Sequence, residues 1–334
     1  MDVSIIIVNY QTPKLVIDCV RSIKEKTEGI TYEVILVDNG SKDGSADLLR
    51  EALQEEVTLV VSDVNLGFGR ANNLGVGYAS GKYVLLLNSD TLLLNNAVRI
   101  LYDYLETHRQ AGVAGGSLYT KEYKPSPSFC THFDDLESAK KEAAWSRILG
   151  TSLRNRYVQW FSSPEQKERF YYKESFNFHK KAKRVAYIFG TDMMLSKALY
   201  EKMGGFDPDF FMYAEEEEMS FRITQAGYEI VNVPAAKLIH YDAASTEKEK
   251  EPNGRRYILR QKGAFLYYEK RFGRKGAQTY YQYQLLGLDR RLKLGRLLGR
   301  KSLAEAAGSR KRYLKEAYEQ FLKEQDAKGE GKDG

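Results

Sequence analysis

Val84-Leu85-Leu86-Leu87-Asn88-Ser89-Asp90 places a short apolar run directly before three polar side chains. A continuous apolar run of this length is typical of a strand that is buried on both faces of a sheet. Parallel strands present ligand-binding groups at their carboxyl ends, so we expect Asp90 where a metal-bound phosphate would lie. Because Asn, Ser and Asp also cap helices, a helix N-cap is the structural alternative for this stretch.

The residues around this stretch alternate between strand-like and helix-like patterns over roughly the first 115 positions. We expect strands at Val3–Val8, Val34–Val37, Val57–Val61 and Tyr83–Leu87. We expect helices at Leu15–Ile23 and Ala46–Leu53, a third that follows the Asn65–Asn73 loop and runs to about Ala79, and a fourth that Asn95 or Asn96 caps and that runs to about Thr107. Alternation of this kind predicts a mostly parallel sheet with helices on both faces.

Polar groups follow each of the four expected strands. They are Asn9-Tyr10, Asp38, Asp63 with Asn65, and Asn88 to Asp90. Four such ends in one parallel sheet converge on one crevice, which favours a nucleotide-type ligand. Neither a GxGxxG turn after the first strand nor a GxxxxGK[ST] loop is present, so a dinucleotide-binding fold and a P-loop enzyme are disfavoured.

The second half of the chain predicts more varied elements. Residues 121–183 are polar, aromatic and basic, which indicates an insertion with one candidate helix at Lys140–Leu153. Further on we expect helices at Leu195–Met203, Glu215–Ala226, Arg255–Arg271 and Leu285–Leu298, a strand at Ile230–Val233 that Pro234 ends, and a disordered tail from about Lys328. No internal repeat is found.

Composition points to a cytoplasmic protein with a basic extension. Cys19 and Cys130 form neither a disulfide framework nor a metal-binding pattern, and we expect no signal peptide and no transmembrane helix. Between Arg255 and Arg300, thirteen Lys and Arg stand against two acidic residues, although the whole chain carries only +6. A basic segment on an otherwise acidic body suggests contact with an anionic surface.

Several ordered motifs resemble the family 2 inverting glycosyltransferases, most of all bacterial rhamnosyltransferase-like members. The motifs are Ile5–Tyr10, Ile35–Ser41, Asn65–Asn73, Leu87–Asp90, Gly204–Glu216, Arg222–Gly227 and Leu238–His240. The resemblance runs from Val3 to about Ser245 and is weak at 121–183. It implies a GT-A-type α/β domain over 1–245, with a nucleotide-sugar half at 1–115, a variable insertion at 121–183, an acceptor and catalytic half at 184–245, and a basic helical extension at 246–334.

The resemblance also implies residue roles. Donor-binding residues would be Asn9, Tyr10, Asp38, Asn65, Gly67, Arg70, Asn73, Asn88 and Ser89. Asp90 and His240 would bind Mg²⁺ or Mn²⁺ at the donor diphosphate, while Asp192 and Tyr213 would lie on the acceptor side. The alternatives are a strand-end His240 bound to a backbone carbonyl and an Asp192 that caps the helix expected from Leu195.

An inverting transfer needs a carboxylate that takes the proton of the acceptor hydroxyl, and we expect it within Glu215–Glu218. Glu216 is the first candidate and Glu215 the second; Glu218 would orient neighbours and Glu217 would be solvated. The alternative is that acidic residues simply stabilise a helix N-terminus. Two departures from the family pattern are Glu216 in place of the usual aspartate and a single acid, Asp90, where many relatives have two.

Together these features predict a metal-dependent inverting glycosyltransferase of cell-surface polysaccharide synthesis. It would move a sugar, with L-rhamnose as a candidate, from a nucleotide-diphosphate donor to a glycan or lipid-linked glycan. The basic stretch 255–300 would hold it peripherally on the inner face of the cell membrane, or would pack on the catalytic domain or in a homodimer. We expect no nucleic-acid partner. A nucleotidyltransferase and a non-catalytic scaffold that binds anionic polymers or membranes are the competing hypotheses.

Overall fold

The computed structural model describes residues 1–144, 162–241 and 254–330. Their contacts divide them into two compact units. The α/β unit comprises residues 1–133, 168–211 and 215–241, and the helical unit comprises 134–144, 162–167, 212–214 and 254–330. Each unit is therefore built from segments that are separated in the sequence, and the predicted boundary at 245/246 lies outside the described residues.

The α/β unit carries the strands and most of the short helices. The strands are β1 (Val3–Asn9), β2 (Tyr32–Asn39), β3 (Thr58–Ser62), β4 (Tyr83–Asn88), β5 (Thr91–Leu93), β6 (Ala111–Tyr119), β7 (Pro125–Ser126), β8 (Phe129–Cys130), β9 (Lys183–Val185), β10 (Tyr187–Ile188), β11 (Asp192–Ser196) and β12 (Glu229–His240). The helices are α1 (Pro13–Lys26), α2 (Ser45–Leu53), η1 (Gln54–Glu56), α3 (Phe68–Val76), α4 (Ala97–Thr107), α8 (Lys197–Lys202) and α9 (Glu215–Gln225); α7 (Pro164–Tyr172) has residues in both units.

Most of the strands form one large sheet along the path β3-β2-β1-β4-β11-β6-β12-β5, with β7 paired to β6 and β9 paired to β12, while β8 and β10 form a separate small sheet. The first four strands are all parallel, whereas β11 runs antiparallel to both of its neighbours. In the register, Asn9 is the partner of Asp38, so the carboxyl ends of β1 and β2 finish side by side. The predicted α/β fold class, a mostly parallel sheet flanked by helices, is confirmed.

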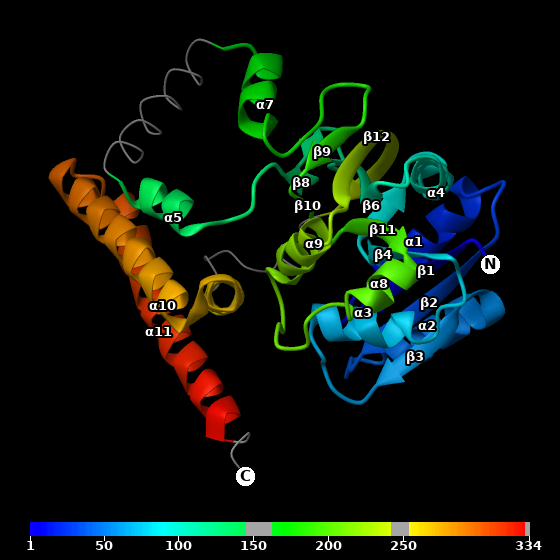
Figure 1. The fold of residues 1–334 in the computed structure, drawn as a ribbon, viewed down its shortest axis with the longest axis horizontal. Helices are drawn as coiled ribbons and strands as arrows, with labels where there is room; N and C mark the ends of the chain where they lie inside the picture. Colours follow the sequence, from blue (N-terminus) through cyan, green and yellow to red (C-terminus); the bar gives the residue numbers. More distant parts are fainter. Residues whose placement is uncertain (145–161, 242–253, 331–334) are drawn as a thin grey trace. The chain divides into compact units, whose positions relative to one another are not determined.

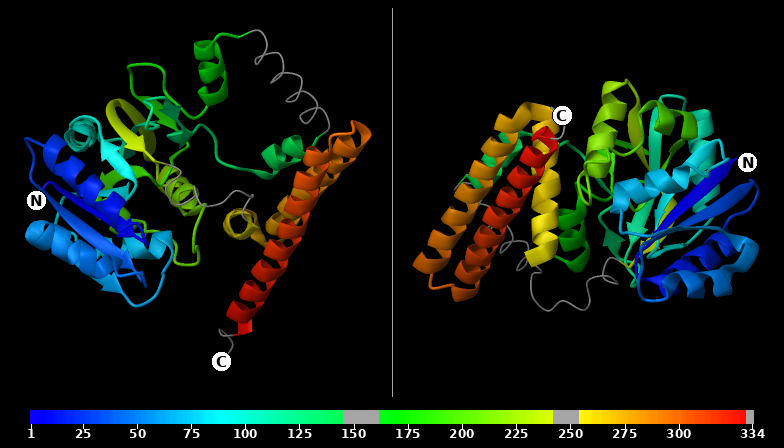
Figure 2. Two further views of the ribbon diagram at one scale, coloured as in Figure 1. Left: turned by 180° about the vertical axis from the view of Figure 1, so that it is seen from behind. Right: turned by 90° about the horizontal axis from the view of Figure 1, so that it is seen from below.

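Strand β1 shows why a continuous apolar run is needed at the centre of the sheet. Ile5 and Ile7 pack into a core that includes residues of α1 and α4, while Ile6 packs into a second core that includes residues of α3 and α9. Successive side chains of a strand point to opposite faces, so a strand covered on both sides must be apolar at every position. Figure 2 shows the helices on the two sides of this sheet.

Two expected boundaries were wrong. Leu195 lies in strand β11, and the helix begins only at Lys197, where Ser196 caps it by accepting a hydrogen bond from the Leu199 N–H. The last strand continues through Pro234 to His240, because the pairing of β12 with β6 shifts register between Asn232 and Lys237. A proline is tolerated at such an irregularity since no ladder hydrogen bond needs its missing N–H.

The helical unit contains α5 (Leu136–Ala143), α10 (Gly254–Leu297) and α11 (Lys301–Glu330). Helix α10 is broken at Gly273, whose φ of +72° is not helical. Its two segments and α11 pack through aromatic rings, including Tyr281 stacked on Tyr318 with centroids 4.1 Å apart. Figures 1 and 2 show α10 and α11 running side by side.

Two predictions for this region concern residues next to those that the structure does not describe. The helix expected at Lys140–Leu153 begins earlier, as α5, and residues 145–153 lie outside the described part of the chain. Helix α11 extends to Glu330, so residues 328–330 of the expected disordered tail are helical, and 331–334 lie outside the description. Within the described residues, no helix combines the length and apolar character that crossing a membrane requires.

Candidate active site

The ends of β1 and β2 are joined by a buried polar network. Asn9 Nδ2 donates to Asp38 Oδ2 over 2.7 Å, and the Ser41 N–H donates to Asp38 Oδ1 over 3.0 Å. Asp38 is fully buried, so its carboxylate organises the loop and is not open to a nucleobase in this structure. The ring of Tyr10, by contrast, is 44% exposed directly after β1 and is available to a ligand.

The end of β4 meets the end of β12. His240 Nε2 lies 3.3 Å from Asp90 Oδ1, and the Tyr241 N–H donates to the Asp90 carbonyl over 2.9 Å. Ser89, also at this end, has its hydroxyl 3.4 Å from that of Thr12 at the start of α1. The side chains of Asn88, Ser89 and Asp90 are all partly exposed, so this strand end is accessible to a ligand.

The spacing of Asp90 and His240 fits one divalent ion. Two neighbouring ligands of an octahedral ion at about 2.1 Å lie about 3 Å apart, close to the observed separation. In the described residues no third His, Cys, Asp or Glu joins them. A site with two protein ligands is typical of ions that take their remaining ligands from substrate phosphates and water.

The loop between β3 and α3 is held by hydrogen bonds that consecutive backbone N–H groups donate. Asn39 Oδ1 accepts from the Leu66 N–H over 2.8 Å, and Asn65 Oδ1 accepts from the Gly67 N–H over 2.9 Å. The Phe68 N–H donates to the Phe211 carbonyl over 2.9 Å, which ties the loop to the segment that leads to α9. Gly67 has a φ of +82°, and a Cβ there would lie 2.0 Å from the Phe211 oxygen.

Gly67→Ala should therefore destabilise the protein more than a conformationally matched substitution elsewhere. Gly273, at the break in α10, has nearly the same φ and ψ (+72° and 176°, against +82° and −178° at Gly67), but a Cβ there would meet nothing within 4 Å. Both alanine variants carry the backbone strain, about 1–3 kcal/mol, whereas only Gly67→Ala adds a clash of roughly 1–3 kcal/mol. Chemical denaturation of the two variants measures the difference; equal losses of unfolding free energy would refute the close approach.

Two predicted donor-binding residues of α3 are used inside the protein. Both polar atoms of the Asn73 amide are occupied, since Nδ2 donates to the Phe206 carbonyl and Oδ1 accepts from the Phe206 N–H and the Tyr200 hydroxyl. Asn73 thus holds the turn before the 207–211 loop, and its amide is engaged within the protein and not by a donor. Arg70 Nε donates to the Leu66 carbonyl over 2.7 Å, which leaves its remaining guanidinium N–H groups for a phosphate.

The four glutamates at the start of α9 lie in different environments. Glu215 is 2% exposed, and burial together with the nearby Glu216 carboxylate raises its pKa well above the usual value. Glu217 is also buried, so the prediction that it is solvated was wrong. Glu218 forms a bidentate ion pair with Arg222 at 2.7 and 2.8 Å. Glu216 alone of the four is partly exposed.

The two residues before α9 adopt an unusual backbone. Tyr213 and Ala214 have φ values of +73° and +70°, in the left-handed region that non-glycine residues seldom occupy. Both belong to the helical unit, where the Arg260 guanidinium lies 5.4 Å from the Tyr213 ring centroid. Strained backbone of this kind clusters at functional sites, and here it ends two positions before Glu216, the candidate base.

Asp192 is a buried carboxylate on β11 and not a helix cap. Its Oδ2 accepts from the Gly116 N–H over 2.5 Å, whereas Oδ1 is buried without a hydrogen-bond partner. Burial raises the pKa of Asp192 to about 7, although the Gly116 hydrogen bond and nearby His240 oppose the shift. A sugar hydroxyl cannot reach this fully buried group, so its predicted acceptor contact is not supported.

Asp192→Asn should change how stability depends on pH. The pKa of this carboxyl in the unfolded chain is near 3.9, so between about pH 4 and pH 7 only the unfolded state releases the proton. The free energy of unfolding therefore falls by up to about 4 kcal/mol over this range. An asparagine amide does not ionise, so the variant does not lose this stability. We expect the melting temperature of Asp192→Asn, measured in EDTA and relative to the parent, to rise between pH 4.5 and pH 8. A pH-independent difference would contradict the buried charge.

Comparisons with known proteins identify the family of this chain. The family model described as "Glycosyl transferase family 2" matches residues 4–204, well over half of the chain. The chain belongs to glycosyl transferase family 2. This membership supports a transferase and favours the glycosyltransferase prediction over the nucleotidyltransferase and scaffold hypotheses.

This family 2 glycosyltransferase is similar to several named members. It is 26% identical over 233 residues to the N-acetylglucosaminyl-diphospho-decaprenol L-rhamnosyltransferase of Mycobacterium tuberculosis (strain ATCC 25618 / H37Rv), covering 65% of this chain and 68% of that protein. It is 29% identical over 119 residues to the glycosyltransferase GlyG of Streptococcus pneumoniae serotype 4. That match covers 35% of this chain and only 39% of GlyG.

A solved structure shows the same fold. The mannosyltransferase PcManGT of Pyrobaculum calidifontis, in complex with GDP-Man and Mn²⁺, aligns with a TM-score of 0.56 at 15% identity. The alignment covers 96% of this chain and 86% of PcManGT. This family 2 fold therefore occurs in a protein that was solved with a nucleotide sugar and a divalent metal.

Sequence reasoning missed three residues that shape the site of this family 2 glycosyltransferase. Asn39 receives and donates the hydrogen bonds that hold the 65–67 loop, Phe211 supplies the carbonyl beneath Gly67, and Thr12 links Asn9 to Ser89. Asn39 was visible as a polar residue at a strand end. The roles of Phe211 and Thr12 depend on a backbone oxygen and on a tertiary contact, for which the sequence carries no signal.

Proposed function

We propose that this protein is a metal-dependent inverting glycosyltransferase that uses a nucleotide-diphosphate sugar. The observation that carries the proposal is the 3.3 Å approach of Asp90 and His240 at the carboxyl end of β4. A cation bound by this pair would neutralise a diphosphate. The neighbouring strand ends and the exposed Tyr10 ring would receive the nucleoside, and Arg70 would add positive charge to the phosphates.

Glu216 is our candidate for the general base. An inverting displacement requires a carboxylate that is ionised and reachable by the acceptor hydroxyl. Glu215 fits these conditions poorly, because it is buried and its raised pKa disfavours the ionised form. We assign Glu215 the role of a neighbour that helps to position the start of α9, and Glu216 the removal of the acceptor proton.

The reaction follows from these roles. The acceptor oxygen attacks the anomeric carbon while Glu216 takes its proton, and the bond from that carbon to the donor diphosphate breaks on the opposite face. Mg²⁺ or Mn²⁺, when bound, supplies charge stabilisation to the departing diphosphate, so no protein acid is required there. The anomeric configuration inverts because attack and departure are in line.

The acceptor and the sugar are proposed from the relatives. The mycobacterial relative is named as an L-rhamnosyltransferase that acts on a diphospho-decaprenol-linked sugar. We therefore propose a glycan or lipid-linked glycan acceptor and L-rhamnose as the first sugar to test. Calorimetric titration with UDP-, GDP- and dTDP-linked sugars, each with Mn²⁺ and with EDTA, tests the function. Saturable binding of one nucleotide class only with metal supports it; no binding by the folded protein contradicts it.

A lipid-linked acceptor would be reached through the tip of the α10–α11 hairpin. Leu297 and Leu298 are 81% and 54% exposed there, and residues 290–304 contain six Lys and Arg and no acidic residue. Exposed leucines among cations suit insertion into an anionic lipid surface. We propose peripheral membrane contact at this tip.

Replacement of both leucines by serine should weaken binding to vesicles. If both leucines enter the lipid, their replacement removes roughly 3–6 kcal/mol of transfer free energy from water to lipid, which lowers partitioning by at least about 100-fold. Co-sedimentation with phosphatidylglycerol vesicles measures the change, and Leu48→Ser, at an exposed position of the α/β unit, is the control. Unchanged sedimentation of the double variant would refute contact at the tip.

A further inference from the structure

The helical unit contains a polar cavity that the transferase reaction does not use. Its volume is about 140 Å³, and its lining comes from α5, both segments of α10, and α11. The polar side chains that matter for the argument are Glu142, Tyr257, Gln261, Gln284, Arg291 and Arg310. None of them belongs to the donor-binding or catalytic residues of the proposed transferase.

Two arginines in the lining have unused binding capacity. In the described part of the chain, neither Arg291 nor Arg310 makes a hydrogen bond or an ion pair. The adjacent basic residues are used internally: Arg290 donates to the Ala143 carbonyl over 2.6 Å, and Lys311 pairs with Asp289 at 2.6 Å. Arg291 and Arg310, which line the cavity, therefore keep their guanidinium N–H groups available for a ligand.

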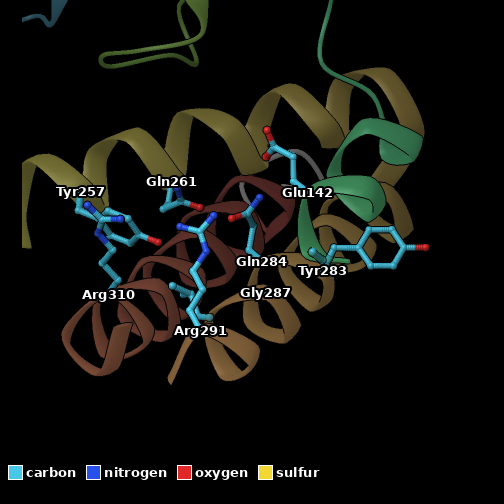
Figure 3. Close-up of a pocket in the computed structure, with 10 residues that line it drawn as sticks. Glu142, Tyr257, Gln261, Tyr283, Gln284, Gly287, Arg291 and Arg310 are labelled. Carbon is cyan, nitrogen blue, oxygen red and sulfur yellow. The ribbon is translucent and has the colours of Figure 1, made fainter. Parts of the chain in front are cut away.

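The positive charges of both arginines influence the same side chain, Tyr257. The pKa of Tyr257 is raised by burial, and Arg310 and then Arg291 oppose that shift, so both positive charges reach its phenol. Figure 3 shows Arg310 beside Tyr257, and the guanidinium of Arg291 between Gln261 and Gln284. Two guanidinium groups and a phenolic hydroxyl around one space form a set of donors that suits a phosphate.

The remaining polar groups are compatible with an anion. Glu142 is the one carboxylate of the described lining; it pairs with neither arginine, and Figure 3 places it on the far side of the cavity from Arg310. Gln261 Oε1 is buried without a hydrogen-bond partner, while its amide contacts the Tyr280 hydroxyl. Rotation of this amide by half a turn lets Oε1 accept from Tyr280 and places the donor Nε2 at the position that has no partner.

We propose that this cavity binds a phosphate group through Arg291 and Arg310, with Tyr257 and Gln261 as further donors. Its volume admits a phosphate or a diphosphate. Arg291 precedes the exposed Leu297 by six helical positions, about 9 Å along the axis, so a lipid headgroup is one source of the phosphate. A soluble phosphate ester is the other source.

The test uses the full chain in EDTA, so that no divalent metal supports diphosphate binding at Asp90. Calorimetric titration with inorganic pyrophosphate should show saturable binding. Arg291→Gln and Arg310→Gln should each weaken it at least tenfold. Arg312→Gln is the matched control, because this exposed arginine of α11 lies two positions from Arg310 and contacts only the Ser309 hydroxyl. Melting curves establish that the variants fold.

The outcomes are distinct. Loss of binding in both cavity variants with normal binding in Arg312→Gln supports the site. No saturable binding by the parent at millimolar pyrophosphate, or an equal loss in all three variants, overturns it. Competition by vesicles that contain phosphatidic acid, but not by phosphatidylcholine vesicles, assigns the phosphate to a lipid headgroup; absence of competition assigns it to a soluble ester. Donor binding with metal is measured separately, so failure of this site and failure of the proposed function are distinguishable.

Discussion

Glu216→Gln should abolish sugar transfer while it leaves donor binding intact. The amide has nearly the same shape as the carboxylate but cannot take the acceptor proton, and loss of a general base costs about 10²–10⁴-fold in turnover. Donor affinity should stay within twofold, because the donor is held by the strand ends and the metal pair. Turnover is measured with the donor and acceptor that the binding panel identifies, and donor affinity by calorimetry.

Two further variants make this result specific. Glu201→Gln changes an exposed glutamate of α8 that pairs only with Lys197, at 3.6 Å, and should retain full turnover. Glu215→Gln removes a carboxyl that is buried away from an acceptor and whose raised pKa favours the protonated form, so it should reduce turnover far less than Glu216→Gln. Full turnover by Glu216→Gln, or a larger loss in Glu215→Gln, would show that the base is assigned to the wrong residue.

Asp90→Asn should remove the metal dependence of donor binding. The amide keeps the volume but loses the charge and the strong cation ligand that faces His240 Nε2 at 3.3 Å. Since loss of an outer-shell partner already lowers metal affinity by about 10–100-fold, loss of a direct ligand should weaken donor binding in Mn²⁺ by about 100-fold or more. Calorimetric titration with and without Mn²⁺ measures both quantities.

The matched control for this substitution is Asp103→Asn. Asp103 is an exposed carboxylate of α4 that forms an ion pair with Arg99 at 2.7 Å, so its replacement removes the same charge without touching the candidate site. We expect parent-like affinity and metal dependence. Asp90→Asn with an unchanged response to Mn²⁺ would exclude Asp90 as a metal ligand, whatever the overall affinity.

The sheet was predictable because its signals are local. The apolar runs at 3–8 and 83–87 report burial on both faces, and the polar residues after them mark the carboxyl ends at which a parallel sheet collects ligand groups. The structure places Asn9, Asp38 and Asp90 at such ends, as expected. Errors came where a local pattern is ambiguous: Leu195 fits a helix or a strand equally well, and only pairing with β4 selects the strand.

The sequence by itself determined the family, the order of the elements and the residues from which a site would be drawn, since covalent order and side-chain periodicity express these directly. Tertiary structure alone decided which of those residues are available. It brought His240 to Asp90, buried Asp38, Asp192 and Glu217, and left Glu216 partly exposed. It also left Arg291 and Arg310 facing a cavity without partners. The physical reason is that burial and hydrogen bonding between segments distant along the chain depend on packing, which no local pattern encodes.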